Sequence, residues 1–251
     1  MKELYQYYLS FFLIQINRFF QWAKVHKVAA VLIGIFAIFF LQYLSLPNNR
    51  LVELRTINPK ITTLMKQRIA EAHADNKPYT IVQQWIPYRN ISQHLKNAVI
   101  VSEDGRFYEH EGVDWYELGE SIEKNIEKGK AARGGSTISQ QLVKNLFLTT
   151  SKDPIRKLKE LIVTIRLERN LSKRRILEIY LNVIELGRGM FGVEAASKKY
   201  FGKSAASLSR IESAQLASII PSPLKHQPNI LSRYVERRTD IILRRMAARG
   251  F

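Results

Sequence analysis

An uncharged apolar run constrains this chain more than any other feature of its sequence. The run is "VAAVLIGIFAIFFLQYLSL", from Val28 to Leu46. A helix of about 20 apolar residues is long enough to cross a bilayer. A cleaved signal peptide has a shorter apolar region that ends in small residues, and the Pro-Asn-Asn that follows Leu46 does not form such a site. We therefore expect a retained transmembrane helix over residues 28–46, with a buried core helix as the alternative.

The residues around this run predict an orientation and a division of the chain. Arg18, Lys24 and Lys27 precede the run, and the positive-inside rule places such a flank in the cytoplasm. Arg50 and Arg55 on the other side weaken this asymmetry. Residues 1–27 are apolar and aromatic with polar interruptions, which favours a cytoplasmic or interfacial segment. We expect residues 47–251 to form one domain on the outer side of the membrane.

The pattern beyond residue 47 is typical of a mainly α-helical domain. Apolar spacing and capping residues predict helices from Thr63 to Ala74, after Ser92, and after Ser136 or Thr137. Residues 75–92 mix β-branched and aromatic residues with prolines, which indicates extended structure. The fold class expected is therefore mainly α, with one N-terminal transmembrane helix.

The charge balance indicates a polyanionic partner. The chain has 39 Lys and Arg against 22 Asp and Glu, a formal net charge of +17. Nucleic acid, an anionic membrane face and a phosphorylated substrate are all compatible with this excess. The basic C-terminal run from residue 233 is expected to rest near anionic headgroups or to form a solvated helix. The absence of cysteine excludes disulfides and thiolate catalysis.

Three short clusters hold the residue types that chemistry needs. The first is "VSEDGRFYEHEG" at residues 101–112, the second "RGGSTISQQLVKN" at 133–145, and the third "IRKLKE" at 155–160. Each has a structural explanation: a solvated turn, a glycine-rich connection, and an ion pair on a helix surface. Together they supply the carboxylates Glu103 and Glu160 with the cations Lys144 and Arg156 between them. Such a set allows one acid to act as a base while the cations stabilise a phosphate leaving group.

The motifs also carry a family resemblance. The words "SEDGRFYEHEGVDW", "RGGSTISQQLVKNLFLT", "RKLKE" and "LERNLSKRRILEIYLN" stand in the order typical of peptidoglycan glycosyltransferases, and the chain resembles the monofunctional form over about residues 54–229. The resemblance implies a lysozyme-like helical head with a smaller jaw lobe near the membrane. It also implies polymerisation of lipid II, with release of undecaprenyl pyrophosphate and inversion at the anomeric carbon.

The resemblance assigns roles to individual residues. Glu103 matches the catalytic base and Glu160 the second acid, near the donor pyrophosphate. Lys144 and Arg156 match the cations that hold this pyrophosphate. The remaining matches are polar positions of the donor site and residues that shape the cleft: Thr137, Gln141 and Asn145, and Asp104, Phe107 and His110. A divalent cation, Mg²⁺ or Mn²⁺, assists at the pyrophosphate in some members of the family, and its carboxylate and phosphate ligands are of the type such ions prefer.

The resemblance further implies a location and partners, and it leaves two rivals. It places the chain in a bacterial inner membrane as a single-pass protein with a periplasmic catalytic domain. The partners implied are lipid II, the growing lipid-linked glycan chain, membrane lipids and other cell-wall synthesis proteins. A lytic enzyme that cleaves glycan strands is the first rival. A membrane-tethered nucleic-acid protein is the second, but the outer location argues against it and we expect no nucleic-acid partner.

Overall fold

The computed structural model describes residues 2–44, 48–120, 135–148 and 154–251, and it divides the chain into two units. The first unit is Met1–Leu46 and the second is Pro47–Phe251. Arg133 and Gly134, at the start of the second sequence cluster, lie outside the described residues.

The first unit consists of two helices, α1 (Lys2–Val25) and α2 (Lys27–Leu44). Large apolar side chains along both are exposed, among them Phe12 and Phe36. Within the described ranges, no helix combines the length and the apolar character that a membrane crossing requires. The structure therefore does not support the expected transmembrane helix over residues 28–46.

The second unit is mainly helical, as predicted. Its elements in chain order are α3 (Asn48–Glu53), α4 (Thr63–Ala74), β1 (Val82–Gln83), the 3₁₀ turn η1 (Tyr88–Asn90), α5 (Gln93–Glu103), α7 (Ile138–Phe147), α8 (Pro154–Asn170), α9 (Lys173–Val183), β2 (Glu185–Gly187), β3 (Met190–Phe191), α10 (Val193–Phe201), η2 (Ala205–Ser207), α11 (Arg210–Ser218) and α12 (Arg233–Ala248). The helix predicted from Thr63 to Ala74 is confirmed.

Capping residues explain where several of these helices begin. Thr137 precedes α7, and its hydroxyl accepts a hydrogen bond from the Gln140 N–H while the Gln140 side chain accepts one from the Thr137 N–H. This reciprocal pair satisfies two N–H groups that a helix start would otherwise leave unpaired. Of the two caps that the sequence offered for this helix, the structure selects Thr137. Ser92 precedes α5 as predicted, but its side chain does not cap the helix.

Short strands, which the helical pattern did not predict, follow α9. The sheet has the order β1-β3-β2, with β1 parallel and β2 antiparallel to β3. Gly189 joins β2 to β3 with φ +70°, and a Cβ there would lie 2.3 Å from the Thr80 carbonyl oxygen. Only glycine accommodates both the left-handed backbone and this close approach. The Gly189 N–H donates to the Tyr79 hydroxyl at 3.1 Å.

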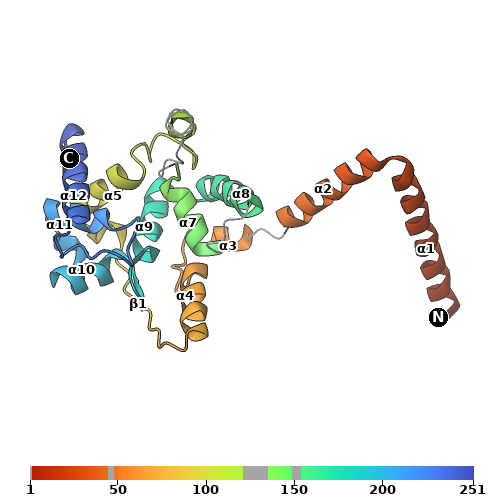
Figure 1. Ribbon diagram of the computed structural model, residues 1–251, viewed down its shortest axis with the longest axis horizontal. Coiled ribbons are helices and arrows are strands. Elements are labelled where there is room, and N and C mark those ends of the chain that lie inside the picture. Colours follow the sequence, from red (N-terminus) through yellow and green to blue (C-terminus); the bar gives the residue numbers. More distant parts are fainter. Residues whose placement is uncertain (1, 45–47, 121–134, 149–153) are drawn as a thin grey trace. The chain divides into compact units, whose positions relative to one another are not determined.

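Two groups of packed helices carry the candidate site. In the first, α5 packs against α11 and α12; in the second, α7 packs against α8 and α9 (Figure 1). The buried side chains of α5 and α7 include Leu95, Val99 and Leu142. Burial of such side chains contributes about 1.5–3 kcal/mol each relative to exposure. The C-terminal end of α5 and the face of α7 are thereby held as rigid supports.

The basic C-terminal run forms α12 and packs against α5, so the simple expectation of a solvated or headgroup-bound helix is incomplete. Val235, Thr239, Ile242 and Met246 form its buried stripe at helical spacing. Arg245, which is also on α12, donates to the Val101 carbonyl oxygen at 3.1 Å. Further contacts, from Arg238 and Arg249, reach Ser102 and Gly105. These arginines satisfy carbonyl and hydroxyl groups at the C-terminal end of α5.

Candidate active site

Glu103 is the last residue of α5, and its carboxylate is largely buried, with 9% of the side chain exposed. Its Oε2 accepts a hydrogen bond from Gln141 Nε2 at 3.1 Å, and its Oε1 accepts one from Ser102 Oγ at 3.0 Å. Burial raises the pKa of Glu103, and the two hydrogen bonds oppose this rise without cancelling it. The group is therefore a stronger proton acceptor than an ordinary glutamate.

The orientation of Gln141 is set by a buried tyrosine. The Tyr180 hydroxyl on α9 donates to Gln141 Oε1 at 2.9 Å, so the amide nitrogen is the end that faces Glu103. Tyr180 is fully buried, and burial raises its pKa well above the ordinary value, which keeps the phenol a donor. No sequence signal distinguishes Tyr180, because within "ILEIYLN" it has the spacing of a core residue.

A cation also faces Glu103 from α12. Arg238 Nη2 lies 3.7 Å from Glu103 Oε1 and donates to Ser102 Oγ at 3.1 Å. Arg238 Nε donates to the Ser218 carbonyl oxygen at 3.0 Å, which holds the guanidinium in place. Its positive charge lowers the pKa of Glu103 and so opposes the effect of burial. Nothing in the basic run around Arg238 distinguished it from its neighbours in the sequence.

Asp104 and His110 tie the first cluster to the start of α7. Asp104 Oδ2 accepts from the Ile138 N–H at 2.9 Å, and Asp104 Oδ1 lies 2.9 Å from His110 Nε2. His110 Nδ1 accepts from the Gly112 N–H at 3.1 Å. Because Nδ1 is an acceptor, the proton of a neutral His110 lies on Nε2, where it is donated to Asp104. The Thr137 hydroxyl adds a bond to the Gly112 carbonyl oxygen at 2.6 Å.

Phe107 lies inside the protein rather than on a surface that a substrate can reach. Its side chain has no exposed area, and the ammonium of Lys173 stands 4.6 Å from the ring centroid. Its role here is to anchor the loop that follows Glu103, which supports the cleft indirectly.

The second acid, Glu160 on α8, is surrounded by cations. Arg156 Nη1 lies 2.7 Å from Glu160 Oε2, and Lys157 Nζ contacts Oε1. Glu160 is only 3% exposed, whereas the side chain of Lys157 is 49% exposed. The pair of Arg156 with Glu160 that the i,i+4 spacing indicates is present. Lys157 was missed, although its i,i+3 spacing to Glu160 was a usable signal.

Lys144 on α7 connects the two acids electrostatically. Burial lowers the pKa of Lys144, while the charge of Glu160 and, more weakly, that of Glu103 raise it. Arg156 and Lys157 act on it in the opposite direction, as like charges do. Asn145, the next residue, is buried and makes no polar side-chain contact within the described ranges. The structure thus gathers Glu103 and Gln141 at one end of the site and the cations around Glu160 at the other.

The donor set does not by itself fit a resident metal ion. Among the described residues, no three His, Asp or Glu side chains are grouped as metal ligands. Both oxygens of Glu160 are already engaged by cations, which compete with a metal for the carboxylate.

Comparisons with known proteins agree with this geometry. The Transglycosylase family model matches residues 69–247, which include both acids and every cation of the site. A protein of Chromobacterium violaceum is 45% identical over 221 residues, covering 88% of this chain and 95% of its own length. The chain belongs to the transglycosylase family. This confirms the resemblance drawn from the motifs and the expectation that the chain is a glycosyltransferase.

Two further relatives are similar over most of their length. One, from Nitrosospira multiformis, is 46% identical over 200 residues, covering 80% of this chain and 87% of its own. Another, from a Janthinobacterium species, is 49% identical over 189 residues, covering 75% of this chain and 82% of its own. All three are named biosynthetic peptidoglycan transglycosylases.

Proposed function

We propose that this chain polymerises lipid II into the glycan strands of peptidoglycan, releasing undecaprenyl pyrophosphate. The observation that carries the proposal is the pairing of two unlike environments on α5, α7 and α8. A buried carboxylate with a raised pKa stands at one end, and a group of cations stands at the other. Names of relatives at 45–49% identity point to the same substrate class.

Glu103 acts as the general base in this proposal. It takes the proton of the acceptor sugar 4-hydroxyl as that oxygen attacks the anomeric carbon of the donor chain. The bond from the anomeric carbon to the pyrophosphate oxygen breaks on the opposite face, so the anomeric configuration inverts. A base with a pKa above that of an ordinary carboxylate holds the proton more tightly, which assists its removal as long as the base is ionised at the working pH. The proton on Glu103 then passes to solvent.

Lys144, Arg156 and Lys157 stabilise the leaving pyrophosphate. Negative charge builds on the phosphate oxygens as the glycosidic bond breaks, and fixed cations near those oxygens lower the energy of that state. Glu160 holds Arg156 and Lys157 in place through its two oxygens. Thr137, which caps α7, positions the segment that carries Lys144.

The lipid-linked substrate also accounts for the N-terminal unit. The exposed apolar side chains of α1 and α2 support attachment to the membrane in which such a substrate resides. We place the catalytic unit on the periplasmic face of the bacterial inner membrane, with a lysozyme-like head and a membrane-proximal jaw lobe. Other cell-wall synthesis proteins are candidate partners there.

One observation also fits the rival lytic function, because a buried glutamate with a raised pKa is suited to act as a general acid. The cations around Glu160 favour polymerisation, because the leaving group of a lytic reaction carries no phosphate.

Purified protein in detergent, incubated with labelled lipid II, tests the proposal. We expect a ladder of glycan polymers from the wild type and from Glu111→Gln, an exposed acid of the same cluster. Glu103→Gln is expected to give none. Release of fragments from finished peptidoglycan, without a ladder from lipid II, would establish the lytic function instead.

A further inference from the structure

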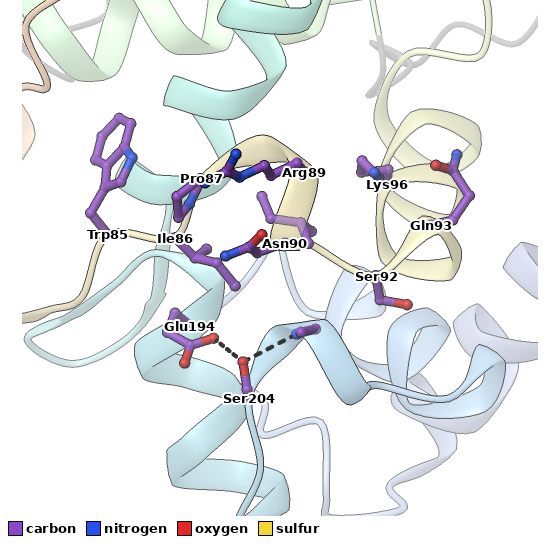
Figure 2. A pocket seen from close by; sticks show the side chains of 12 residues that line it. Trp85, Ile86, Pro87, Arg89, Asn90, Ser92, Gln93, Lys96, Glu194 and Ser204 are labelled. Carbon is purple, nitrogen blue, oxygen red and sulfur yellow. Dashed lines mark hydrogen bonds between the residues drawn. The ribbon is translucent and has the colours of Figure 1, made fainter.

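A large cavity lies at the N-terminal end of α5, whereas Glu103 is at the C-terminal end of this helix. Its volume is about 700 Å³, and it opens between the segment from Trp85 to Asn90 and the N-terminal half of α5, which carries Gln93 and Lys96 (Figure 2). Glu194 and Ser204 close its lower side in this view. None of the roles assigned to Glu103, Glu160 and their partners uses this cavity.

Lys96 gives the cavity a buried positive charge. Only 6% of the residue is exposed, and its Nζ stands 4.4 Å from the centroid of the Tyr88 ring. Across the parts of the chain that the structure describes, no carboxylate lies within ion-pair distance of this ammonium. The guanidinium of Arg174 lies 4.8 Å from the centroid of the same ring and is a like charge. Burial and Arg174 both lower the pKa of Lys96. A buried cation without a counter-ion costs free energy, which an incoming anion would recover.

The start of α5 adds a second source of positive potential. Ser92, in the capping position, donates its hydroxyl to the Leu208 carbonyl oxygen at 3.0 Å instead of accepting from the helix. The first N–H groups of α5 therefore lack a side-chain cap. Ser92 and Gln93 both line the cavity, so this end of the helix borders it. Uncapped N–H groups at a helix start attract oxyanions.

The one acid that lines the cavity is already neutralised. Glu194 Oε2 accepts from Ser204 Oγ at 2.9 Å (Figure 2). It also accepts from the Ala205 N–H at 2.8 Å. Its Oε1 lies 3.1 Å from Lys198 Nζ. The cavity therefore retains an excess of positive charge from Lys96 and the start of α5. Amide groups of Asn90 and Gln93 add neutral hydrogen-bond donors.

The cavity residue Lys96 and the candidate base Glu103 lie on the same helix. Lys96 and Glu103 are seven residues apart on α5, so they lie on one face of the helix about 10.5 Å apart along its axis. The Tyr88 hydroxyl beside Lys96 is 3.4 Å from the hydroxyl of Tyr108, which belongs to the loop after Glu103.

We propose that this cavity binds a carboxylate of the peptide that the glycan substrate carries, with Lys96 as its counter-ion. The inference rests on the proposed function, because that function supplies a substrate with peptide carboxylates as well as phosphates. The phosphates are bound at the other end of the site by Arg156, Lys157 and Lys144. Lys96 is therefore available for a different anion, the peptide carboxylate. The site selects substrates that carry a peptide, and it acts on affinity rather than on the chemical step.

Calorimetric titration with soluble, lipid-free fragments tests this inference independently of turnover. The probes are a disaccharide with its peptide, the same compound with its carboxylates amidated, and the disaccharide alone. We expect wild type to bind the first about tenfold more tightly than the other two, since a hydrogen bond to a charged group contributes an affinity of that order. Lys96→Met is expected to bind all three equally. Lys66→Met, an exposed lysine on α4, is the matched control and should behave as wild type.

Thermal unfolding and lipid vesicles complete the test. Lys96→Met should unfold at or above the wild-type temperature, because it removes an uncompensated buried charge. Equal affinity of wild type and Lys96→Met for the peptide-bearing fragment overturns the inference. So does Lys96-dependent binding to anionic vesicles without binding of the fragment, which assigns the cation to a lipid headgroup. If Glu103→Gln polymerised lipid II, the proposed base would fail while these binding results would stand.

Discussion

The two buried glutamates of the site make the most instructive comparison in this molecule. Glu103 is held by neutral donors, Gln141 and Ser102, and the cation Arg238 lies 3.7 Å away. Glu160 is held on both oxygens by cations at contact distance. The same residue type, largely hidden from water in both places, therefore has a different environment at each. One carboxylate has a raised pKa that suits it to accept a proton, and the other pairs with the cations around it and orients them.

The largest expected effect is on turnover at Glu103. Glu103→Gln removes the base and should lower kcat for lipid II polymerisation by about 10³-fold, within the range of general-base contributions. Single-turnover assays with labelled lipid II measure this. Glu160→Gln should lower kcat much less, because Glu160 does not accept the proton. Equal losses in the two variants would contradict the division of roles.

The two substitutions should also have opposite effects on stability. Because burial raises the pKa of Glu103 in the folded state, the folded protein binds more protons than the unfolded chain between the unfolded and folded pKa values. Its stability therefore falls as pH rises through that window and stays lower at neutral pH. Glu103→Gln removes this penalty and should raise the unfolding temperature at pH 7.

Glu160→Gln should instead destabilise the fold by about 3 kcal/mol, since it removes the buried carboxylate that pairs with both Arg156 and Lys157. Differential scanning calorimetry of both variants at pH 7, beside Glu111→Gln, compares the signs. A stabilised Glu160→Gln would show that the cations around it do not depend on its charge.

A smaller effect is expected from the group that orients Gln141. Tyr180→Phe removes the hydroxyl that donates to Gln141 Oε1, so the amide loses its fixed direction and the buried oxygen loses its donor. We expect kcat to fall about tenfold with KM little changed, and the unfolding free energy to fall by about 1–2 kcal/mol. An unchanged kcat with the same loss of stability would make Tyr180 a structural residue only.

The smallest expected effect concerns the pH profile. Arg238 lowers the pKa of Glu103, so its removal in Arg238→Gln should raise that pKa further. A smaller fraction of Glu103 is then ionised at a given acidic pH, and the acidic limb of the kcat/KM profile moves to higher pH. Arg237→Gln, its exposed neighbour on α12, is the control and should leave the limb in place. A limb that does not move in Arg238→Gln would mean that this cation does not act on the base.

The sequence by itself predicted the helical class, the starts of α5 and α7, and Glu103 and Glu160 as the candidate acids. These depend on interactions within a few residues. Caps such as Thr137, apolar spacing, and the i,i+4 relation of Arg156 to Glu160 are all local, so the chain order encodes them directly. The family motifs added residue roles because they too are short words that remain contiguous in the chain.

Only the tertiary structure decided which neighbour each acid acquired. Gln141 lies 38 positions from Glu103 and 39 from Tyr180, and Arg238 reaches Glu103 from the C-terminal helix. Such contacts depend on how α5, α7, α9 and α12 pack against one another. No local sequence pattern around Tyr180 or Arg238 specifies this packing. The difference in environment between Glu103 and Glu160 arises from this packing, because burial and the distance to a cation are properties of the assembled fold.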